Sequence, residues 1–319
     1  MPELPDITVY VERIAERTRG KVLEAIRFAS PFVLRTAVPP VRDVFGKRLR
    51  DVTRLGKRIV FWFDDDYVLV VHLMVAGRFR WDDAKGAKIP GKLGLAAFDF
   101  ESGTLLLTEA SSKKRASIHL VRGKGKDALR DFDRGGLEVM DAPEAAIVGA
   151  LGRERHTLKR ALTDPTILSG IGNAYSDEIL HAAKLSPLKL TSQVTGEEWT
   201  RLVAAMKRVL AERTEVIRRE SAGSFPERVT AFREDMALHG RYGKPCPVCG
   251  AKIQRIVYAD NETNYCATCQ TGGKLLADRS LSRLLREDWP RSLDELEEKR
   301  PALATLPANP ARSTKSKKP

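Results

Sequence analysis

The chain has 319 residues, of which 42% are hydrophobic and 30% charged, and this length allows two or three domains with sizeable cores. No apolar run reaches the length of a membrane-spanning helix, and the acidic start does not look like an export signal, so we expect a cytoplasmic protein with no membrane partner. The net charge of +13 indicates a polyanionic partner, first of all nucleic acid.

The first predicted element is a helix that begins within the stretch MPELPD. Leu4 is the expected N-cap and Pro5 the first helical residue, where a missing N–H has no consequence. Asp6 then falls in the first turn, where a carboxylate meets the positive end of the helix dipole. Gly20 marks the expected end of the helix. Pro2 lies outside this helix and requires a different explanation.

Residues 20–122 favour β-strands. RIVFWF and DYVLVVHL flank an acidic turn, and GLAAFDF and TLLLTEA flank ESG, which is a hairpin signal. We therefore predict an antiparallel β-sandwich domain over residues 1–122, with the helix leading it. The glycine-rich and charged residues 123–142 suit a linker. Lys57 falls at the start of one strand, where a lysine is most often simply solvated.

The hydrophobic period becomes helical after residue 142. Four helical segments are expected within residues 143–240, and the longest starts with Thr195 and Glu198 at capping-box spacing. Another helix opens with two glycines in SGIGNAYSDEIL, whose free N–H groups suit a phosphate, with Asn173 and Lys159 as further contacts. Such a glycine pair is weak evidence for a phosphate site when it stands alone, because glycines often only form a tight turn.

The strongest local pattern is CPVC followed by YCATC. Cys246 with Cys249, and Cys266 with Cys269, are separated by sixteen residues and include every cysteine of the chain. Four thiolates at this spacing predict a tetrahedral Zn²⁺ site, which is structural because no coordination position stays open. Disulfides and inert buried thiols are the alternatives, and a cytoplasmic location disfavours disulfides. The segment between the pairs is expected to form a β-hairpin.

We therefore predict an α+β multidomain fold. An N-terminal antiparallel β-sandwich with a leading helix precedes a helical domain, and the zinc finger at residues 241–273 follows. Residues 274–319 form an extension, in which SLSRLLRED predicts a helix and the basic end is expected to be disordered. We expect a monomer.

Taken in order, MPELPD, GKRIVF, HLMVAG, GIGNAYSDEIL and the four-cysteine hairpin resemble the formamidopyrimidine-DNA glycosylase/endonuclease VIII family over about residues 1–273. The resemblance implies a β-sandwich and a helix–two-turn–helix domain with a zinc finger, and DNA in the cleft between them. It also implies base-excision repair by a bifunctional DNA glycosylase/AP lyase acting on oxidised bases, which must be flipped out of the helix.

The resemblance also explains Pro2. Removal of Met1 leaves Pro2 with a free secondary amine, which titrates near pH ~8 and is partly neutral at physiological pH. Attack of this amine on sugar C1′ gives a cationic Schiff base, which supports loss of the base and then β/δ-elimination of phosphate. Glu3 is the implied acid/base at the sugar, and Lys57 assists the elimination.

The resemblance thus assigns two groups of site residues. The catalytic candidates lie near the N-terminus, and the DNA contacts are spread over both domains and the finger. The catalytic candidates are Pro2, Glu3, Asp6 and Lys57. The DNA-binding candidates are Lys159, Asn173, Met74, Val75 and Asn261.

Several positions depart from the family pattern. Asp6 replaces the usual Glu, and Asn261 replaces an expected Arg of the zinc hairpin. Val75 stands where the family has its gap-filling Met, and Met74 comes one position early. On a strand, a shift of one position would place the Met74 side chain on the opposite face. The stretch EASSKKRASI at 109–118 has no aromatic residue where the family has an Arg-Phe loop. The nucleophilic end therefore matches the family, while the residues that fill the vacated stack differ.

These departures predict a preference for single-stranded or unpaired DNA, with the basic run 113–115 tracking the backbone. A non-catalytic damaged-DNA-binding protein is the main alternative, and an RNA- or ribosome-associated zinc protein is a third. Pro2 and Glu3 favour the enzyme, because a binding protein needs neither a free amine nor an acid beside it. The choice of lesion is expected to depend on a loop near residues 221–225.

Overall fold

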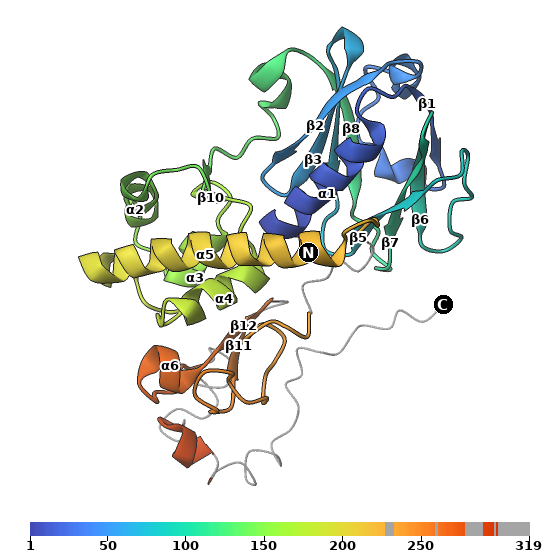
Figure 1. Cartoon of the computed structure of the whole chain (residues 1–319). Coiled ribbons are helices and arrows are strands. Elements are labelled where there is room, and N and C mark those ends of the chain that lie inside the picture. Colours follow the sequence, from blue (N-terminus) through green and yellow to red (C-terminus); the bar gives the residue numbers. More distant parts are fainter. Residues whose placement is uncertain (227–232, 259–260, 278–289, 297, 299–319) are drawn as a thin grey trace, which may run out of the picture.

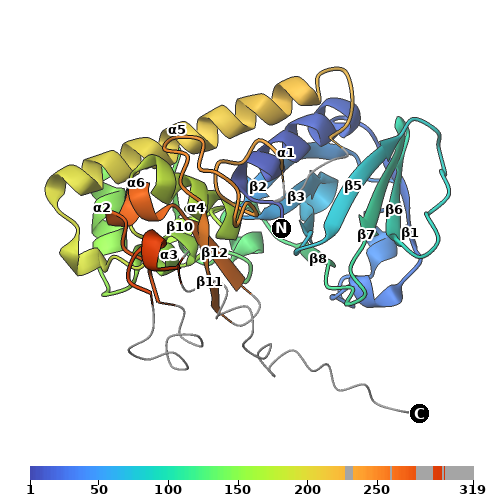
Figure 2. The same ribbon diagram turned by 90° about the horizontal axis from the view of Figure 1, so that it is seen from below.

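The computed structural model describes residues 1–226, 233–258, 261–277, 290–296 and 298. A β-sandwich lies beside a helical domain, and the cysteine module lies against the helices (Figure 1). The chain begins where these parts meet, as the view from below also shows (Figure 2). No helix in the described part of the chain is both long and apolar enough to cross a membrane.

Helix α1 (Leu4–Thr18) leads the chain and packs against both the sandwich and the longest helix. Its N-cap is Glu3, so the prediction of Leu4 as the cap is wrong by one residue. The reason is local: Oδ2 of Asp6 accepts the backbone N–H of Glu3 at 2.8 Å, which closes the first turn one residue earlier.

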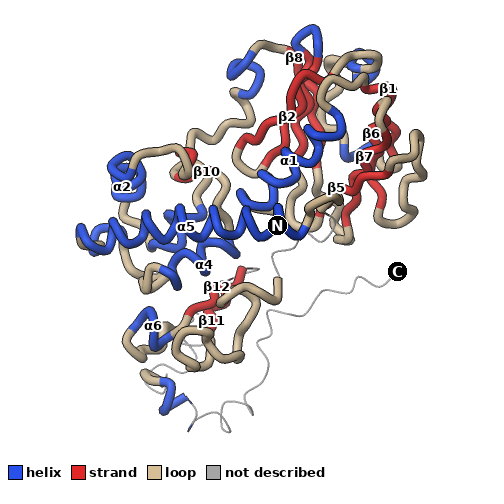
Figure 3. The backbone as a smooth tube through the Cα atoms, viewed as in Figure 1, coloured by secondary structure: helices blue, strands red, loops and turns tan. Residues whose placement is uncertain are grey.

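Two four-stranded antiparallel sheets form the predicted sandwich (Figure 3). Their inner faces share an apolar core, in which the rings of Phe61, Phe79 and Phe98 lie 6.0–6.3 Å apart, centroid to centroid. The first sheet has the order β1 (Leu23–Phe28), β6 (Gly94–Phe100), β7 (Gly103–Glu109) and β5 (Gly77–Asp82). The second has the order β2 (Leu49–Leu55), β3 (Arg58–Phe63), β4 (Tyr67–His72) and β8 (Ser117–Arg122).

Short 3₁₀ helices connect the strands and precede the helical domain. They are η1 (Pro31–Val33), η2 (Val41–Val44), η3 (Asp64–Asp66) and η4 (Gly125–Leu129). The acidic turn predicted between two strands is η3. Within the segment expected to be a linker, β9 (Leu137–Glu138) pairs in parallel with β10 (Leu168–Ser169), so part of this segment is built into the helical domain.

The four predicted helices follow around a second apolar core. They are α2 (Glu144–Gly152), α3 (Leu158–Thr163), α4 (Asn173–Ala182) and α5 (Gly196–Glu220), with η5 (Thr191–Gln193) before the last. The capping box of Thr195 and Glu198 is present at the start of α5, as predicted.

The cysteine module contains the expected hairpin, β11 (Gln254–Tyr258) and β12 (Asn261–Tyr265), followed by α6 (Ala267–Thr271). The chain beyond it returns to the module, because the N–H of Leu276 donates to the Tyr265 hydroxyl at 2.8 Å. The predicted helix at SLSRLLRED and the basic tail lie outside the described residues.

Each domain places one side chain in the other. Leu4 of α1 belongs to the core of the helical domain, and Phe225, after α5, belongs to the core of the sandwich. The Phe225 ring lies 5.7 Å from that of Tyr10, and the Arg17 guanidinium stands over it at 5.5 Å. At its C-terminal end, the segment expected to select the lesion is therefore anchored in the core.

Candidate active site and DNA-binding surface

The catalytic candidate Glu3 caps a helix of the other domain. Its carboxylate is buried and accepts backbone N–H groups of Gly172 (2.6 Å), Ala174 (2.9 Å) and Tyr175 (3.2 Å). These groups form the start of α4, whose positive end stabilises a carboxylate. The prediction that free N–H groups here receive a phosphate is wrong for these three groups, because Glu3 occupies them.

Gly172 allows two catalytic candidates to approach α4 closely. A Cβ at this position would lie 2.5 Å from Oε1 of Glu3 and 2.6 Å from Nζ of Lys57. Lys57 lies in the tight turn between β2 and β3, one residue before the strand. Burial lowers the pKa of Lys57, and the Glu3 carboxylate partly opposes this effect. The Lys57 ammonium therefore points into the junction that holds Glu3, not into solvent.

The chain terminus lies at the same junction. Pro2 is buried and Met1 half-buried. Burial lowers the pKa of the Met1 amine; Glu3 opposes this effect and the Arg78 cation adds to it. Burial also raises the pKa of Asp6 to about 7. A terminal amine and two carboxyl groups therefore share one largely dehydrated site.

The turn after β4 carries both candidates for gap filling. The alternation predicted for Met74 and Val75 is wrong, because β4 ends at His72 and residues 73–76 form a turn. Met74 has a left-handed backbone (φ 52°), and its N–H donates to Nδ1 of His72 at 2.9 Å. Burial, with nearby cations, lowers the pKa of His72 to about 4, so the ring is neutral and can accept this bond. Val75 stands at the tip, 59% exposed.

The phosphate-contact candidates lie where α4 meets the zinc finger. Nζ of Lys159 donates to Oδ1 of the buried Asp177 (2.5 Å) and to the Asn173 carbonyl (2.7 Å). The Asn173 amide donates to the Glu262 carbonyl of β12 at 2.8 Å. These two bonds use two of the three donors of the Lys159 ammonium, and the side chain is 12% exposed, so the third donor is left for another partner. Asn261, the remaining candidate, is exposed as the first residue of β12.

Sequence reasoning missed two buried acids that join α4 to the finger. Oδ2 of Asp177 lies 2.8 Å from Nδ1 of His239 and accepts the N–H of Asn264 at 3.2 Å. The Glu178 carboxylate accepts three consecutive N–H groups, those of residues 237–239, at 2.7–2.9 Å. Two adjacent acids inside an otherwise apolar helical pattern were the available signal, because buried carboxylates need partners.

The four cysteines form one metal site. Sγ atoms of Cys246, Cys249, Cys266 and Cys269 all lie within 4.8 Å of one another, which fits a tetrahedral zinc ion. Nε2 of His181 in α4 lies 3.3 Å from Sγ of Cys246, outside the four-sulfur set. The site thus holds one structural zinc ion, and it stands directly against the helix that Glu3 caps.

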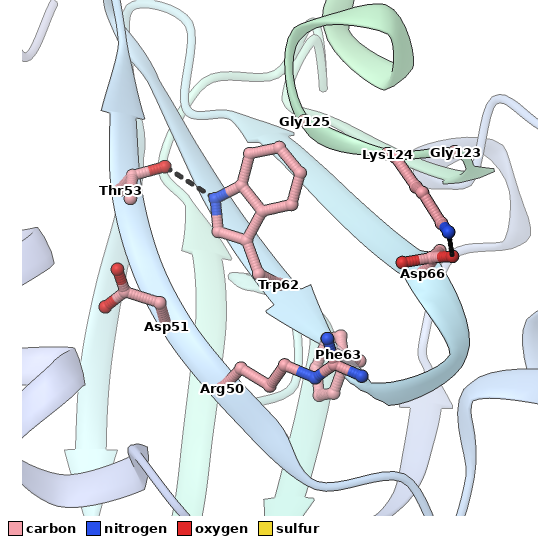
Figure 4. A pocket seen from close by; sticks show the side chains of 9 residues that line it. All are labelled: Arg50, Asp51, Thr53, Trp62, Phe63, Asp66, Gly123, Lys124 and Gly125. Atoms are coloured by element: carbon pink, nitrogen blue, oxygen red, sulfur yellow. Dashed lines mark hydrogen bonds and ion pairs between the residues drawn. The ribbon is translucent and has the colours of Figure 1, made fainter.

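A separate pocket lies on the outer face of the sandwich (Figure 4). Its floor is Trp62, whose indole N–H donates to Oγ1 of Thr53 at 2.8 Å, and Lys124 and Asp66 form an ion pair at its edge. Phe61 and Phe63 point into the core, so Trp62 points outward and lies at the other end of β3 from Lys57. This pocket contains none of the predicted site residues.

A β-sandwich beside a helical domain with a four-cysteine site, and a chain terminus between them, is the arrangement of one class of base-excision DNA glycosylases. The sequence matches the formamidopyrimidine-DNA glycosylase N-terminal domain over residues 1–120 and the H2TH domain of that glycosylase over residues 139–223. It also matches the zinc finger found in FPG and IleRS over residues 243–272. The chain belongs to the formamidopyrimidine-DNA glycosylase family.

Known relatives match either most of the chain or about half of it. The formamidopyrimidine-DNA glycosylase of Thermus thermophilus is 30% identical over 280 residues, 86% of this chain and 100% of that protein. An uncharacterised formamidopyrimidine-DNA glycosylase-like protein of Mycobacterium tuberculosis is 40% identical over 151 residues, 47% of this chain and 94% of that protein. The crystal structure of MutM (Fpg) from Thermus thermophilus has a TM-score of 0.71 at 29% identity and covers 84% of this chain and 98% of its own. A complex of Lactococcus lactis Fpg with abasic-site DNA has a TM-score of 0.74 at 25% identity, with coverage of 84% and 99%.

Proposed function

We propose that this chain is a base-excision DNA glycosylase with AP-lyase activity, which removes oxidised bases through Pro2 after Met1 is cleaved off. The relatives are named for the glycosylase activity, and one neighbour is a complex with abasic-site DNA. The observation that carries the proposal is the buried contact of Glu3 with α4, which holds an acid beside the chain terminus and ties both domains to that point.

In the proposed reaction, the residues of this junction act one after another. The Pro2 nitrogen attacks C1′, the bond from C1′ to the base breaks, and the base leaves with the electron pair and a proton. Opening of the sugar gives the iminium, with Glu3 moving the proton at the ring oxygen. Loss of a C2′ proton then expels the 3′ phosphate, Lys57 assists this elimination, and water hydrolyses the adduct. Burial lowers the pKa of the Met1 amine, and we expect the same burial to favour the neutral Pro2 amine that the first step needs.

Borohydride trapping on abasic-site DNA tests this mechanism. The native protein should form a covalent adduct, Pro2→Gly should form less, and Glu3→Gln should trap slowly because it lacks the acid. Protein with an uncleaved N-terminal extension is the matched control, since it keeps every side chain but has no free Pro2 nitrogen. Binding of abasic DNA without any adduct would favour the non-catalytic damage-binding alternative.

We further propose that unpaired DNA is the better substrate. Val75 is a short side chain at the tip of its turn, and the loop between β7 and β8 has no aromatic residue to enter the stack. Flipping a base from a duplex costs a few kcal/mol, which an unpaired base avoids. Single-turnover rates on single-stranded, bubbled and duplex DNA with one oxidised base measure this preference. A duplex preference of about tenfold, equal to about 1.4 kcal/mol, would contradict it.

A further inference from the structure

Four segments far apart in the sequence meet at one end of the sandwich. Gly77 pairs with Glu109, whose N–H donates to the Leu93 carbonyl at 2.8 Å, so the starts of β5 and β6 and the end of β7 are neighbours. Leu34 bridges to Ile118 at the start of β8, which brings the chain around η1 to the same place. We call the segments 29–36, 73–78, 91–95 and 109–118 the end surface.

The end surface is strongly basic. Its segments carry six Lys or Arg residues and a single acid, Glu109. Glu109 is 1% exposed, and its Oε2 accepts the N–H groups of Arg115 (2.9 Å) and Ala116 (3.0 Å). Its carboxylate therefore binds backbone groups of its own loop and is not exposed on the surface. Lys114 is anchored as well, because its ammonium donates to the carbonyls of Lys92 (3.0 Å) and Glu109. Arg78 is held in the same way by the carbonyls of Val75 and Gly77. The other four cations, Arg35, Lys92, Lys113 and Arg115, are available to a polyanion.

Phe32 is the single aromatic residue of these four segments. It is 79% exposed, whereas its neighbour Val33 is buried in the sandwich core and fixes the short helix η1. The ring therefore projects outward from a turn that Val33 anchors in the core. A large apolar side chain held outward among cations is the combination that single-stranded nucleic acid uses, because bases stack on the ring and phosphates meet the charges.

The end surface also adjoins the reaction site. The Arg78 guanidinium donates to the Val75 carbonyl at 3.2 Å, and its charge lowers the pKa of the chain-terminal amine. The turn that carries Val75 thus stands beside the terminus. This turn belongs to the end surface, so the surface begins next to the terminus.

We propose that Phe32 is a stacking platform for an unpaired base near the lesion, with the free cations of the end surface binding the adjoining phosphates. This inference rests on the proposed function and deepens it, because it places a base-binding element outside the gap-filling turn. Stacking of one base on an aromatic side chain corresponds to a change of roughly 5- to 150-fold in affinity.

The test compares Phe32→Ala and Phe32→Trp with native protein. The control is Val38→Ala, which truncates another exposed apolar side chain (84% exposed) six residues further along the chain and outside the end surface. Dissociation constants are measured at one salt concentration for single-stranded, bubbled and fully paired DNA carrying an uncleavable abasic-site analogue. Phe32→Ala should weaken binding of single-stranded and bubbled DNA about tenfold and binding of fully paired DNA much less. Phe32→Trp should restore the native affinity, and Val38→Ala should leave all three dissociation constants unchanged.

Equal weakening on all three DNAs, or none, would overturn the platform. A 2-aminopurine base next to the analogue adds a direct readout, because stacking on the ring quenches its fluorescence in native protein but not in Phe32→Ala. Borohydride trapping at saturating DNA separates the two proposals. Absence of an adduct with native protein would refute the lyase mechanism, while the binding comparison would still decide the role of Phe32.

Discussion

The contact of Glu3 with α4 can be perturbed without substituting Glu3 or Lys57, the two proposed catalytic residues beside it. Gly172→Ala adds a methyl group 2.5 Å from Oε1 of Glu3 and 2.6 Å from Nζ of Lys57. The backbone at Gly172 is extended (φ −131°), so alanine adds no backbone strain there. Both contacted atoms end flexible side chains, so the side chains move and the backbone does not.

The magnitude follows from the hydrogen bonds that this movement breaks. Ordinary contact begins near 3.4 Å, so the Glu3 carboxylate must shift by about 1 Å, which breaks the 2.6 Å bond to the Gly172 N–H. A hydrogen bond to a charged group contributes about 1.5–3 kcal/mol, and we expect a loss of stability in this range. Activity should fall further, by about 10- to 100-fold, because a displacement of about 1 Å at a reacting centre has this effect.

Urea unfolding and single-turnover cleavage of abasic DNA measure the two effects. Gly149→Ala is the control, because Gly149 lies within α2 and a Cβ there meets nothing within 4 Å. It should leave activity unchanged and stability equal or slightly higher. Gly172→Ala protein with native stability and a cleavage rate within about twofold of native would refute the reasoning.

Three further predictions follow from the same structure. Cys249→Ser, or removal of zinc, should abolish DNA binding while the sandwich stays folded, and active protein with less than about half an equivalent of zinc would contradict this. Lys159→Ala should lower the slope of log affinity against log salt by about one, and an unchanged slope would mean that Lys159 stays on Asp177 in the complex. Burial raises the pKa of Asp6 from 3.8 in the unfolded chain to about 7 in the folded protein. The free energy of unfolding should therefore decrease as the pH rises from about 4 to about 7. Asp6→Asn should remove this loss, at most about 1.4 kcal/mol per pH unit, and unfolding curves at pH 5 and 7 that shift equally in both proteins would refute it.

The sequence by itself determined the features that depend on neighbouring residues. The order of strands and helices, the hairpin at ESG and the capping box at Thr195 follow from periodicity and local hydrogen bonding, and all are present. The cysteine spacing determined the zinc site, because a hairpin between two close pairs brings the four sulfurs together. The family motifs likewise indicated a reactive N-terminus.

Tertiary structure alone decided which partner each of these groups meets. Glu3 caps α4 across a separation of 169 residues, so N–H groups that looked free for phosphate are occupied. Met74 was misplaced because a strand pattern cannot show that a histidine side chain accepts a backbone N–H and turns the chain. Phe32 was not recognised, since its place beside the 109–118 loop depends on strand register and not on sequence distance. Hydrogen bonds and burial between distant segments depend on the packed fold, and a local pattern carries no information about them.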